Sequence, residues 1–280
     1  MSTAVDLATP ADETGDTPGT PGPRRDIVRT VIRGVGQTLV TFGLVCLLFV
    51  VYELWVTDLF AAQAQSHLSQ EIHQEWKDAP TVAPAPSTPG QPAAPFTPAA
   101  VHVTVGQPFA VLHIPRLAGG DGFSRVVVEG VSQEQLAQGP GHYIGTAMPG
   151  EQGNASFAGH RVGRGSPFLD LDKLQPGDPI VVETADAWFT YRVLGDPKTG
   201  SFSGDPSGIP GQEIVLPTQV SVISPTPDGP ANGPATGAYL TLTTCHPKFS
   251  AHQRLIIHAR LDGAPLSKAQ APNGPAAMAG

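Results

Sequence analysis

The sequence predicts a mainly β domain, closed as a barrel or folded as a sandwich, that follows a single transmembrane helix. A long uncharged segment near the N-terminus indicates the helix, and short apolar segments separated by Gly and Pro turns indicate the β domain. With 30 Pro and 32 Gly among 280 residues, part of the chain cannot belong to a packed core. We therefore expect one compact domain accompanied by unstructured segments.

Residues 1–33 are predicted to form a disordered cytoplasmic tail with a basic flank. The first 23 residues are rich in Thr, Pro, Gly and Asp and cannot bury enough apolar surface to offset chain entropy. Positive charges then gather before the uncharged segment, at Arg24, Arg25, Arg29 and Arg33. Such charges mark the cytoplasmic side of a membrane helix, so everything after about Thr57 should lie outside the cell membrane.

Residues 34–56 are predicted to span the membrane. The segment Gly34 to Tyr52 carries no charge. As a helix it would extend about 28 Å at about 1.5 Å per residue, close to the thickness of the hydrocarbon layer. Aromatic residues of the interfacial type follow at Tyr52, Trp55 and Phe60. A cleaved signal peptide is the alternative, but the run is longer than a usual signal core and no clear small-residue cleavage site follows it.

Beyond the membrane the composition predicts four further segments. Residues 57–78 have helical composition and form a juxtamembrane helical segment. Residues 79–100 are rich in Pro and Ala, which predicts an extended, semi-rigid stalk. The folded domain is expected at residues 101–261, and the Ala, Pro and Gly of residues 262–280 predict a disordered tail.

Within the folded domain, eight short segments have the composition of strands. They are Phe109 to Ile114, Ser124 to Val131, Asn154 to His160, Pro179 to Thr184, Trp188 to Leu194, Val220 to Ile223, Tyr239 to Cys245 and Gln253 to Leu261. One short helix is predicted at Ser132 to Gln138, with Ser132 as N-cap and Gln135 completing a capping box. A further helical turn is expected at Pro167 to Leu171.

Charge and composition exclude several functions. The net charge of -8 gives no general attraction to a phosphate backbone, so no nucleic-acid partner is expected. Two Cys cannot form a four-Cys zinc site or a multi-bridge disulfide scaffold. Asp121, Asp170 and Asp172 do not have the pattern of a calcium loop. We therefore expect no metal and no cofactor.

Cys245 is the candidate nucleophile. Cys46 lies in the apolar run and is interpreted as a small buried hydrophobe, which leaves Cys245 as the one thiol outside the membrane. Alternation along its strand places Cys245 opposite the face of Leu240 and Leu242, so the thiol should be accessible. Arg254 on the next strand shares that face. The alternative interpretation is an inert buried thiol beside a surface Arg.

A thiol nucleophile needs a basic partner, because the thiolate is the attacking species. Among nine His, His160 is favoured because it ends a strand-like segment and enters a Gly-rich loop. His246 should point to the other face of the strand, and His142 lies in a Gly/Pro loop. Four others are interpreted as surface or core side chains: His67, His73, His113 and His258.

These residues resemble the sortases, cell-wall transpeptidases of Gram-positive bacteria. The elements that carry the resemblance are TLTTC at Thr241 to Cys245, Arg254 nine residues later, and AGHR at Ala158 to Arg161. The similarity continues through FAVLHIPRL (Phe109 to Leu117), GHYIGTAMPGEQGNASFAGHR (Gly141 to Arg161), SPFLDLDKLQPGD (Ser166 to Asp178) and TCHPKFSAHQRLIIHARL (Thr244 to Leu261). Within the family, the context is most similar to the class E sortases of actinobacteria.

The resemblance implies an eight-stranded β-barrel with Cys245 at the end of the seventh strand and Arg254 in the eighth. It implies that Cys245 attacks the Thr–Gly bond of a sorting motif, that His160 transfers protons, and that Arg254 stabilises the oxyanion. Thr244 and Thr243 are the implied substrate-binding and oxyanion residues. Class E similarity implies a Leu-Ala-x-Thr-Gly motif rather than Leu-Pro-x-Thr-Gly.

The implied partners are exported proteins with a C-terminal sorting signal and a peptidoglycan amine, on the precursor lipid II or on a cross-bridge. Two alternatives remain at this stage. A cysteine L,D-transpeptidase also couples an exported Cys to a His, although its Ser-x-Gly-Cys context is absent here. A non-catalytic wall-binding barrel would leave Cys245 without a chemical role.

Overall fold

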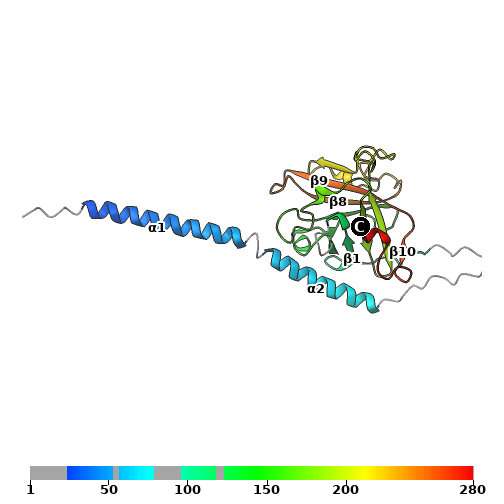
Figure 1. Cartoon of the computed structure of the whole chain (residues 1–280), viewed down its shortest axis with the longest axis horizontal. Helices are drawn as coiled ribbons and strands as arrows, with labels where there is room; N and C mark the ends of the chain where they lie inside the picture. The colour runs from blue at the N-terminus through cyan, green and yellow to red at the C-terminus, as the bar shows by residue number, and fades with distance from the viewer. Residues whose placement is uncertain (1–23, 53–56, 79–95, 118–122, 280) are drawn as a thin grey trace, which may run out of the picture. The chain divides into compact units, whose positions relative to one another are not determined.

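The computed structural model describes residues 24–52, 57–78, 96–117 and 123–279. The chain forms two compact units, residues 1–50 and residues 51–280, and each is described by itself (Figure 1). The predicted N-terminal tail over residues 1–23 and residues 79–95 of the predicted stalk lie outside the described residues.

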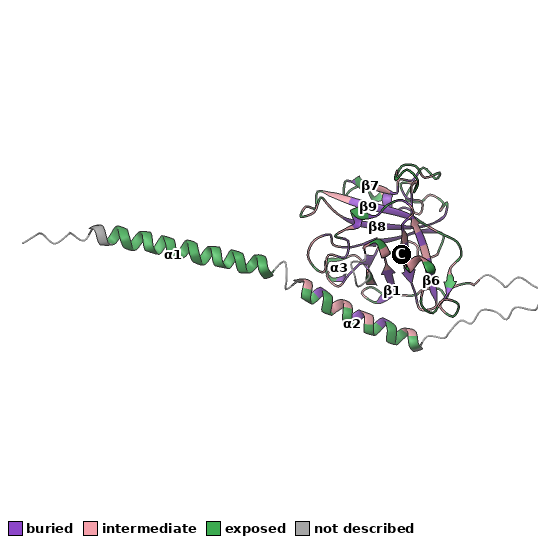
Figure 2. Cartoon of the chain, viewed as in Figure 1, coloured by how far each residue is buried: buried purple, intermediate pink, exposed green. Residues whose placement is uncertain are grey.

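Helix α1 (Arg24–Val51) is a candidate membrane span. Its segment Ile27–Val51 is long and apolar enough to cross a membrane. None of its most apolar window is buried, and Figure 2 shows the described side chains of α1 exposed along the helix. A core helix of a soluble protein would instead be mostly buried. The candidate span begins earlier than the predicted Gly34 and includes Arg29 and Arg33.

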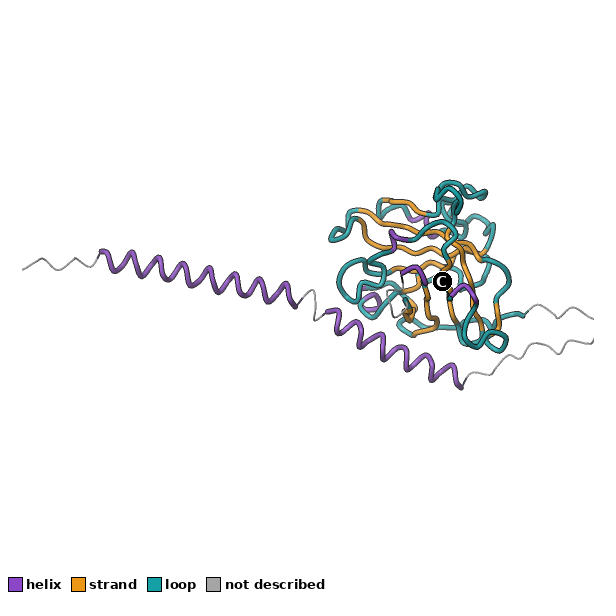
Figure 3. The backbone as a smooth tube through the Cα atoms, in the orientation of Figure 1, coloured by secondary structure: helices purple, strands orange, loops and turns teal. Residues whose placement is uncertain are grey.

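The second unit is built on a closed barrel of eight strands (Figure 3). Hydrogen-bonded neighbours follow the order β6-β5-β1-β2-β3-β4-β8-β9, and β9 also pairs with β6, which closes the ring. Strands β7 and β10 add to its edges. The bounds are β1 (Pro108–His113), β2 (Ser124–Glu129), β3 (Gly141–His142), β4 (Gly153–Ala158), β5 (Pro179–Glu183), β6 (Ala187–Val193), β7 (Gln212–Val215), β8 (Ala238–His246), β9 (Gln253–Leu261) and β10 (Leu266–Ser267). The predicted eight-stranded barrel is thereby confirmed.

One face of β8 and β9 packs into the main core, as the alternating sequence predicts. Leu240 and Leu242 are fully buried there. The opposite face was expected to be accessible, but Thr241 and Thr243 are buried as well. Ile256 on that face packs against Val215 of β7 and other apolar side chains from residues 222–223. The expectation was wrong because alternation reveals two faces of a strand but not whether another segment, here β7 and residues 222–223, covers the second one.

Four short elements differ from the sequence prediction. Val220–Ile223 is a 3₁₀ helix, η4, although its β-branched residues favoured a strand. Strands β3, β7 and β10 were missed because they are only two, four and two residues long. Helix α3 (Gln133–Leu136) is confirmed, with Ser132 as its N-cap. The helical turn expected at Pro167 to Leu171 is present slightly later, as the 3₁₀ helix η3 (Leu171–Lys173).

Helix α2 (Thr57–Asp78) belongs to the same compact unit as the barrel. Leu68 and Ile72 are buried in one cluster with Val111 of β1 and with Val126 and Val128 of β2. Its amphipathic pattern is therefore satisfied by the outer surface of the barrel. The folded unit extends further toward the N-terminus than the predicted residue 101.

The C-terminal residues 262–279 are ordered against the barrel, contrary to the prediction of a disordered tail. Strand β10 pairs with β6, with Leu266 opposite Trp188. The Trp188 indole Nε1 donates a hydrogen bond to the Ala271 carbonyl at 2.9 Å. The Lys268 ammonium lies 3.8 Å from the centre of the Trp76 ring, a cation–π contact. Composition missed this packing because the partners of the tail are distant in sequence.

Candidate active site

The register of three neighbouring strands brings Cys245, His160 and Arg254 to one end of the barrel. Cys245 of β8 is directly paired with Arg254 of antiparallel β9. On the other side, β4 runs parallel to β8 with Ala158 opposite Thr243, and the Gly159 amide donates to the Thr243 carbonyl at 3.1 Å. β4 ends at Ala158, and continuing its register for two residues beyond the strand would bring His160 level with Cys245. Residues paired in this way project from the same face of a sheet.

Cys245 is a free, half-buried thiol at the penultimate position of β8. It is the first residue on its face of β8 that is not fully covered, since Thr241 and Thr243 are buried. The strand therefore holds the sulfur at the boundary between packed core and accessible surface, where a nucleophile can be both positioned and reached.

His160 is half-buried, and its Nε2 atom is buried without a hydrogen-bond partner. The His160 carbonyl accepts a hydrogen bond from the Phe168 amide at 3.0 Å, which fixes the backbone after β4. Burial lowers the pKa of His160, and the positive charge of Arg164 lowers it further. At neutral pH the imidazole is therefore mainly neutral and able to accept a proton.

Arg254 is held against the connection between β8 and β9. Its Nη1 atom donates to the carbonyls of Ala251 and Gln253, both at 3.0 Å. A guanidinium has five N–H donors in a rigid fork, so these two bonds orient the group without using all its donors. The arrangement supplies a fixed positive charge on the face that carries the thiol.

The hydroxyls of Thr243 and Thr244 have partners within the protein. Thr244 Oγ1 donates to the Gly159 carbonyl at 2.8 Å, and Thr243 Oγ1 lies 2.9 Å from the Tyr143 hydroxyl. Both residues are buried. These contacts join β8 to the segments that precede His160. The oxyanion role of the two residues stays a prediction.

Sequence reasoning missed Arg161, which connects the His160 segment to the end of β8. Its side chain is 3% exposed. Nη1 lies 2.9 Å from His246 Nδ1 and 3.4 Å from the Cys245 carbonyl, and Nη2 forms an ion pair with Asp172 at 3.1 Å. The sequence signal that could have identified Arg161 was its position directly after His160 in the AGHR segment. The contact between Arg161 Nη1 and His246 Nδ1 also holds the His246 ring.

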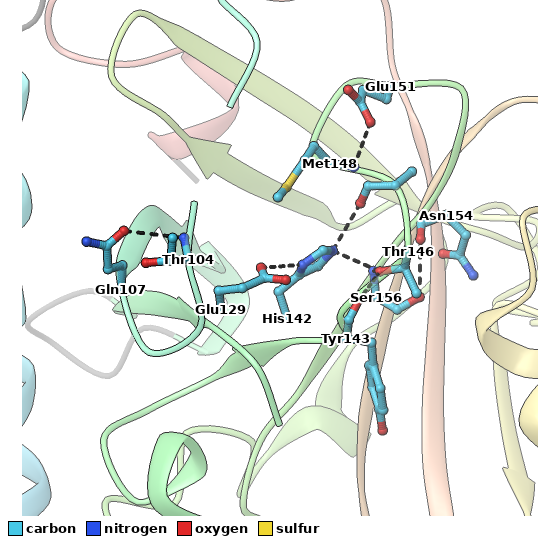
Figure 4. A network of polar contacts seen from close by, with 11 residues as sticks. Thr104, Gln107, Glu129, His142, Tyr143, Thr146, Met148, Glu151, Asn154 and Ser156 are labelled. Atoms are coloured by element: carbon cyan, nitrogen blue, oxygen red, sulfur yellow. Dashed lines mark hydrogen bonds and ion pairs between the residues drawn. The ribbon is translucent and has the colours of Figure 1, made fainter. Parts of the chain in front are cut away.

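The other buried His side chains have structural partners. His142 Nδ1 lies 2.7 Å from Glu129 Oε2, and its Nε2 lies 2.8 Å from Thr146 Oγ1, so both ring nitrogens are engaged (Figure 4). His113 Nε2 lies 2.9 Å from Glu183 Oε2. His113 was interpreted as a surface or core side chain, whereas His142 was a candidate because it lies in a Gly/Pro loop. His160 differs from both by its unpaired buried nitrogen.

Within the described part of the chain, the group of side chains suited to a metal ion is Glu213, Asp228 and His258. His258 is paired with Thr241, four residues along each strand from Arg254 and Cys245. At about 3.3 Å per residue, that separation is about 13 Å. This group is therefore distinct from the candidate active site.

The three groups at the strand ends have the properties that acyl transfer requires. A thiol can form a covalent acyl intermediate, a neutral imidazole can accept and return its proton, and a fixed cation can stabilise a developing oxyanion. No one of the three residues carries this inference alone. The inference rests on the strand pairing that brings the three residues to the same end of the barrel.

The comparisons with known proteins agree with this chemistry. Residues 112–262 match the Sortase domain family. Sortase SrtE1 of Streptomyces coelicolor is 36% identical over 82% of this chain and 56% of its own length. Sortase SrtE2 of the same organism is 32% identical over 84% of this chain and 83% of its own length. The chain thus spans little more than half of the first relative.

The fold is also similar to solved structures. The SrtF sortase from Corynebacterium diphtheriae superposes with a TM-score of 0.56 at 35% identity. That match covers 67% of this chain and 98% of the other.

Proposed function

Because this chain belongs to the sortase family, we propose that it is a cysteine transpeptidase that joins exported proteins to the cell wall. It cleaves a C-terminal sorting motif between Thr and Gly and transfers the new carboxyl end to a peptidoglycan amine. The observation that supports the proposal is the pairing of Cys245 with Arg254 across β8 and β9, beside β4, which ends two residues before His160.

The first half of the reaction forms a thioester. The Cys245 thiol transfers its proton to His160 while the sulfur attacks the Thr carbonyl carbon. Arg254 stabilises the oxyanion as charge moves to the carbonyl oxygen. The C–N bond then breaks, and the imidazolium of His160 returns the proton to the departing Gly amine.

The second half releases the product. An incoming peptidoglycan amine attacks the thioester carbonyl, and neutral His160 accepts a proton from that amine. The C–S bond breaks, the proton returns to Cys245, and an amide is formed. The lowered pKa of His160 supports this role, because it keeps the imidazole free to accept a proton at neutral pH.

We propose the sorting motif and the location of the enzyme from sequence similarity and from helix α1. We propose a Leu-Ala-x-Thr-Gly type of motif, on the ground of the identity to Streptomyces sortases of the E type. The amine is carried by lipid II or by a cross-bridge. Helix α1 anchors the enzyme in the cell membrane, and the Arg residues before it favour a cytoplasmic N-terminus with the barrel outside.

Incubation of the full chain in detergent with sorting-motif peptides and an amine acceptor tests the proposal. Mass spectrometry should show a thioester adduct on Cys245, loss of the Gly-containing fragment and an acceptor-linked product. Leu-Ala-x-Thr-Gly peptides should react faster than Leu-Pro-x-Thr-Gly peptides.

Cys245→Ala should abolish both adduct and product, whereas Cys46→Ala, at the exposed thiol of α1, should react normally. Peptide cleavage that persists in Cys245→Ala would refute the assignment.

A further inference from the structure

We propose that Glu213, Asp228 and His258 form a binding site for a divalent transition-metal ion, with Zn²⁺ as the best-matched ion. Each residue offers one ligand atom, and the three atoms lie within 4.8 Å of one another. Two atoms bound to one zinc ion at about 2.1 Å are at most about 4.2 Å apart, so small side-chain movements suffice for coordination.

Asn154 and Thr241, which are not among the three ligands, orient the His258 imidazole for metal binding. Asn154 Nδ2 donates to the carbonyls of Val222 at 3.1 Å and Ser224 at 3.0 Å, which fixes the orientation of the amide. Its Oδ1 atom must then accept from the Thr241 hydroxyl at 2.8 Å. Because the Thr241 hydroxyl already donates its hydrogen to Asn154, Thr241 Oγ1 can only accept a hydrogen bond from His258 Nδ1, at 2.9 Å.

This chain of bonds places the proton of the neutral His258 ring on Nδ1. Nε2 is then left with a lone pair that faces Glu213 Oε1 at 3.1 Å, an oxygen that also carries lone pairs. The ring is fully buried. Two acceptors at this distance need a cation between them, and the candidates are a proton or a metal ion. A ligating His commonly has its other ring nitrogen donating to an oxygen, as Nδ1 does here.

The donor set favours a transition metal over calcium. One imidazole nitrogen and two carboxylates suit Zn²⁺, whereas Ca²⁺ requires six to eight oxygen ligands. With a neutral ring, the two ionised carboxylates leave a net charge of -2 that a divalent ion would balance.

A metal here would join three segments that are separate in the sequence. Glu213 lies on edge strand β7, His258 on barrel strand β9, and Asp228 in the loop before β8. That loop and β7 cover the outer face of β8 and β9. The ion would therefore hold this cover in place, a role that does not depend on the proposed transpeptidase activity.

The test is equilibrium dialysis of the tag-free full chain in detergent against buffered Zn²⁺, with bound metal measured by mass spectrometry. A Cys245→Ala background removes the thiol that would otherwise compete for zinc. We expect one bound equivalent, weaker binding of Ca²⁺, and an X-ray absorption spectrum with one nitrogen ligand, oxygen ligands and no sulfur.

Glu213→Gln and Asp228→Asn should each weaken zinc binding at least about tenfold, and Thr241→Val should weaken it about 10- to 100-fold by releasing the ring. Glu183→Gln is the matched control. It also removes one carboxylate charge from a His–Glu pair, that of His113 with Glu183, but this pair has no second carboxylate that could complete a metal site. Binding should persist in that variant. Two results would overturn the proposal: no zinc bound to the parent protein, or Glu213→Gln and Asp228→Asn variants that bind zinc as tightly as the parent. Either result would mean that a proton lies between His258 Nε2 and Glu213.

Discussion

At the scale of single residues, Arg161 is a positioning group beside the candidate active site. Its guanidinium lies against the Cys245 carbonyl, the His246 ring and the Asp172 carboxylate. It therefore fixes the end of β8 relative to the segment that carries His160. The Arg161 side chain acts on the backbone and on neighbours of the thiol, and its contribution should be visible in kcat rather than in substrate binding.

Arg161→Gln should lower kcat with little change in KM and should lower the free energy of unfolding by about 1–3 kcal/mol, since buried partners lose their hydrogen bonds. Steady-state kinetics and chemical denaturation measure the two effects. Arg161→Lys keeps the charge but not the fork and should recover only part of kcat. An unchanged kcat in a well-folded Arg161→Gln variant would contradict the positioning role.

Arg164 should control the titration of His160. Because its charge lowers the pKa of His160, Arg164→Gln should move that pKa toward its ordinary value. An NMR titration of the His160 ring should show the upward shift, and the limb of the pH–rate profile that reports His160 should move with it. Lys198→Gln, at an exposed position, is the control for net charge and should leave the ring unchanged.

The same shift has a consequence for stability. A folded-state pKa below the unfolded value means that the unfolded chain binds more protons between the two values. The free energy of unfolding therefore falls as the pH decreases from the ordinary pKa of His160 to its lowered pKa in the folded state. Arg164→Gln should reduce this acid-dependent loss, measured by denaturation at a series of pH values.

At the scale of elements, hydrogen bonds from two side chains add to the apolar packing of helix α2 on the barrel. Gln65 Oε1 accepts from the Val126 amide at 2.8 Å, and its Nε2 donates to the carbonyls of Gln138 at 2.7 Å and Val126 at 3.1 Å. Asp58 Oδ1 also accepts from the Gly165 amide at 2.8 Å, in the loop that follows His160. The helix thereby contacts the segment that carries a candidate catalytic residue.

Gln65→Ala should lower the free energy of unfolding by about 1–3 kcal/mol, because the Val126 and Gln138 groups lose their partners. Gln63→Ala, at an exposed position of the same helix, should change stability by less than about 0.5 kcal/mol. Thermal and chemical denaturation compare the two variants. Equal stabilities would mean that water replaces the Gln65 contacts without loss.

At the scale of the whole second unit, α2 is part of the fold rather than a spacer. A chain that begins at Phe96 should lose the cover over Val111, Val126 and Val128, whereas one that begins at Tyr52 keeps it. Burial of Leu68 and Ile72 contributes about 1.5–3 kcal/mol each. The shorter chain should therefore unfold at a lower temperature and bind an apolar dye. Identical unfolding midpoints would show that α2 contributes nothing to the folded unit.

Much of the barrel could be predicted from local pattern. Alternation and turn residues identified seven of the strands that the structure contains, and the Cys245, His160 and Arg254 candidates came from residue type and strand position. Strand β7 and the 3₁₀ helix η4 were not predicted, because an edge strand of four residues and a short β-branched run carry little local signal.

The sequence alone determined the apolar helix, the alternating strands and the three chemical groups, because each depends on residue type and on spacing within one segment. Only the tertiary structure decided that β7 and η4 cover the outer face of β9, that α2 and the C-terminal residues pack on the barrel, and that Arg161 joins the His160 segment to the Cys245 carbonyl. Those outcomes depend on contacts between segments far apart in the chain, and periodicity within a segment does not identify its partner.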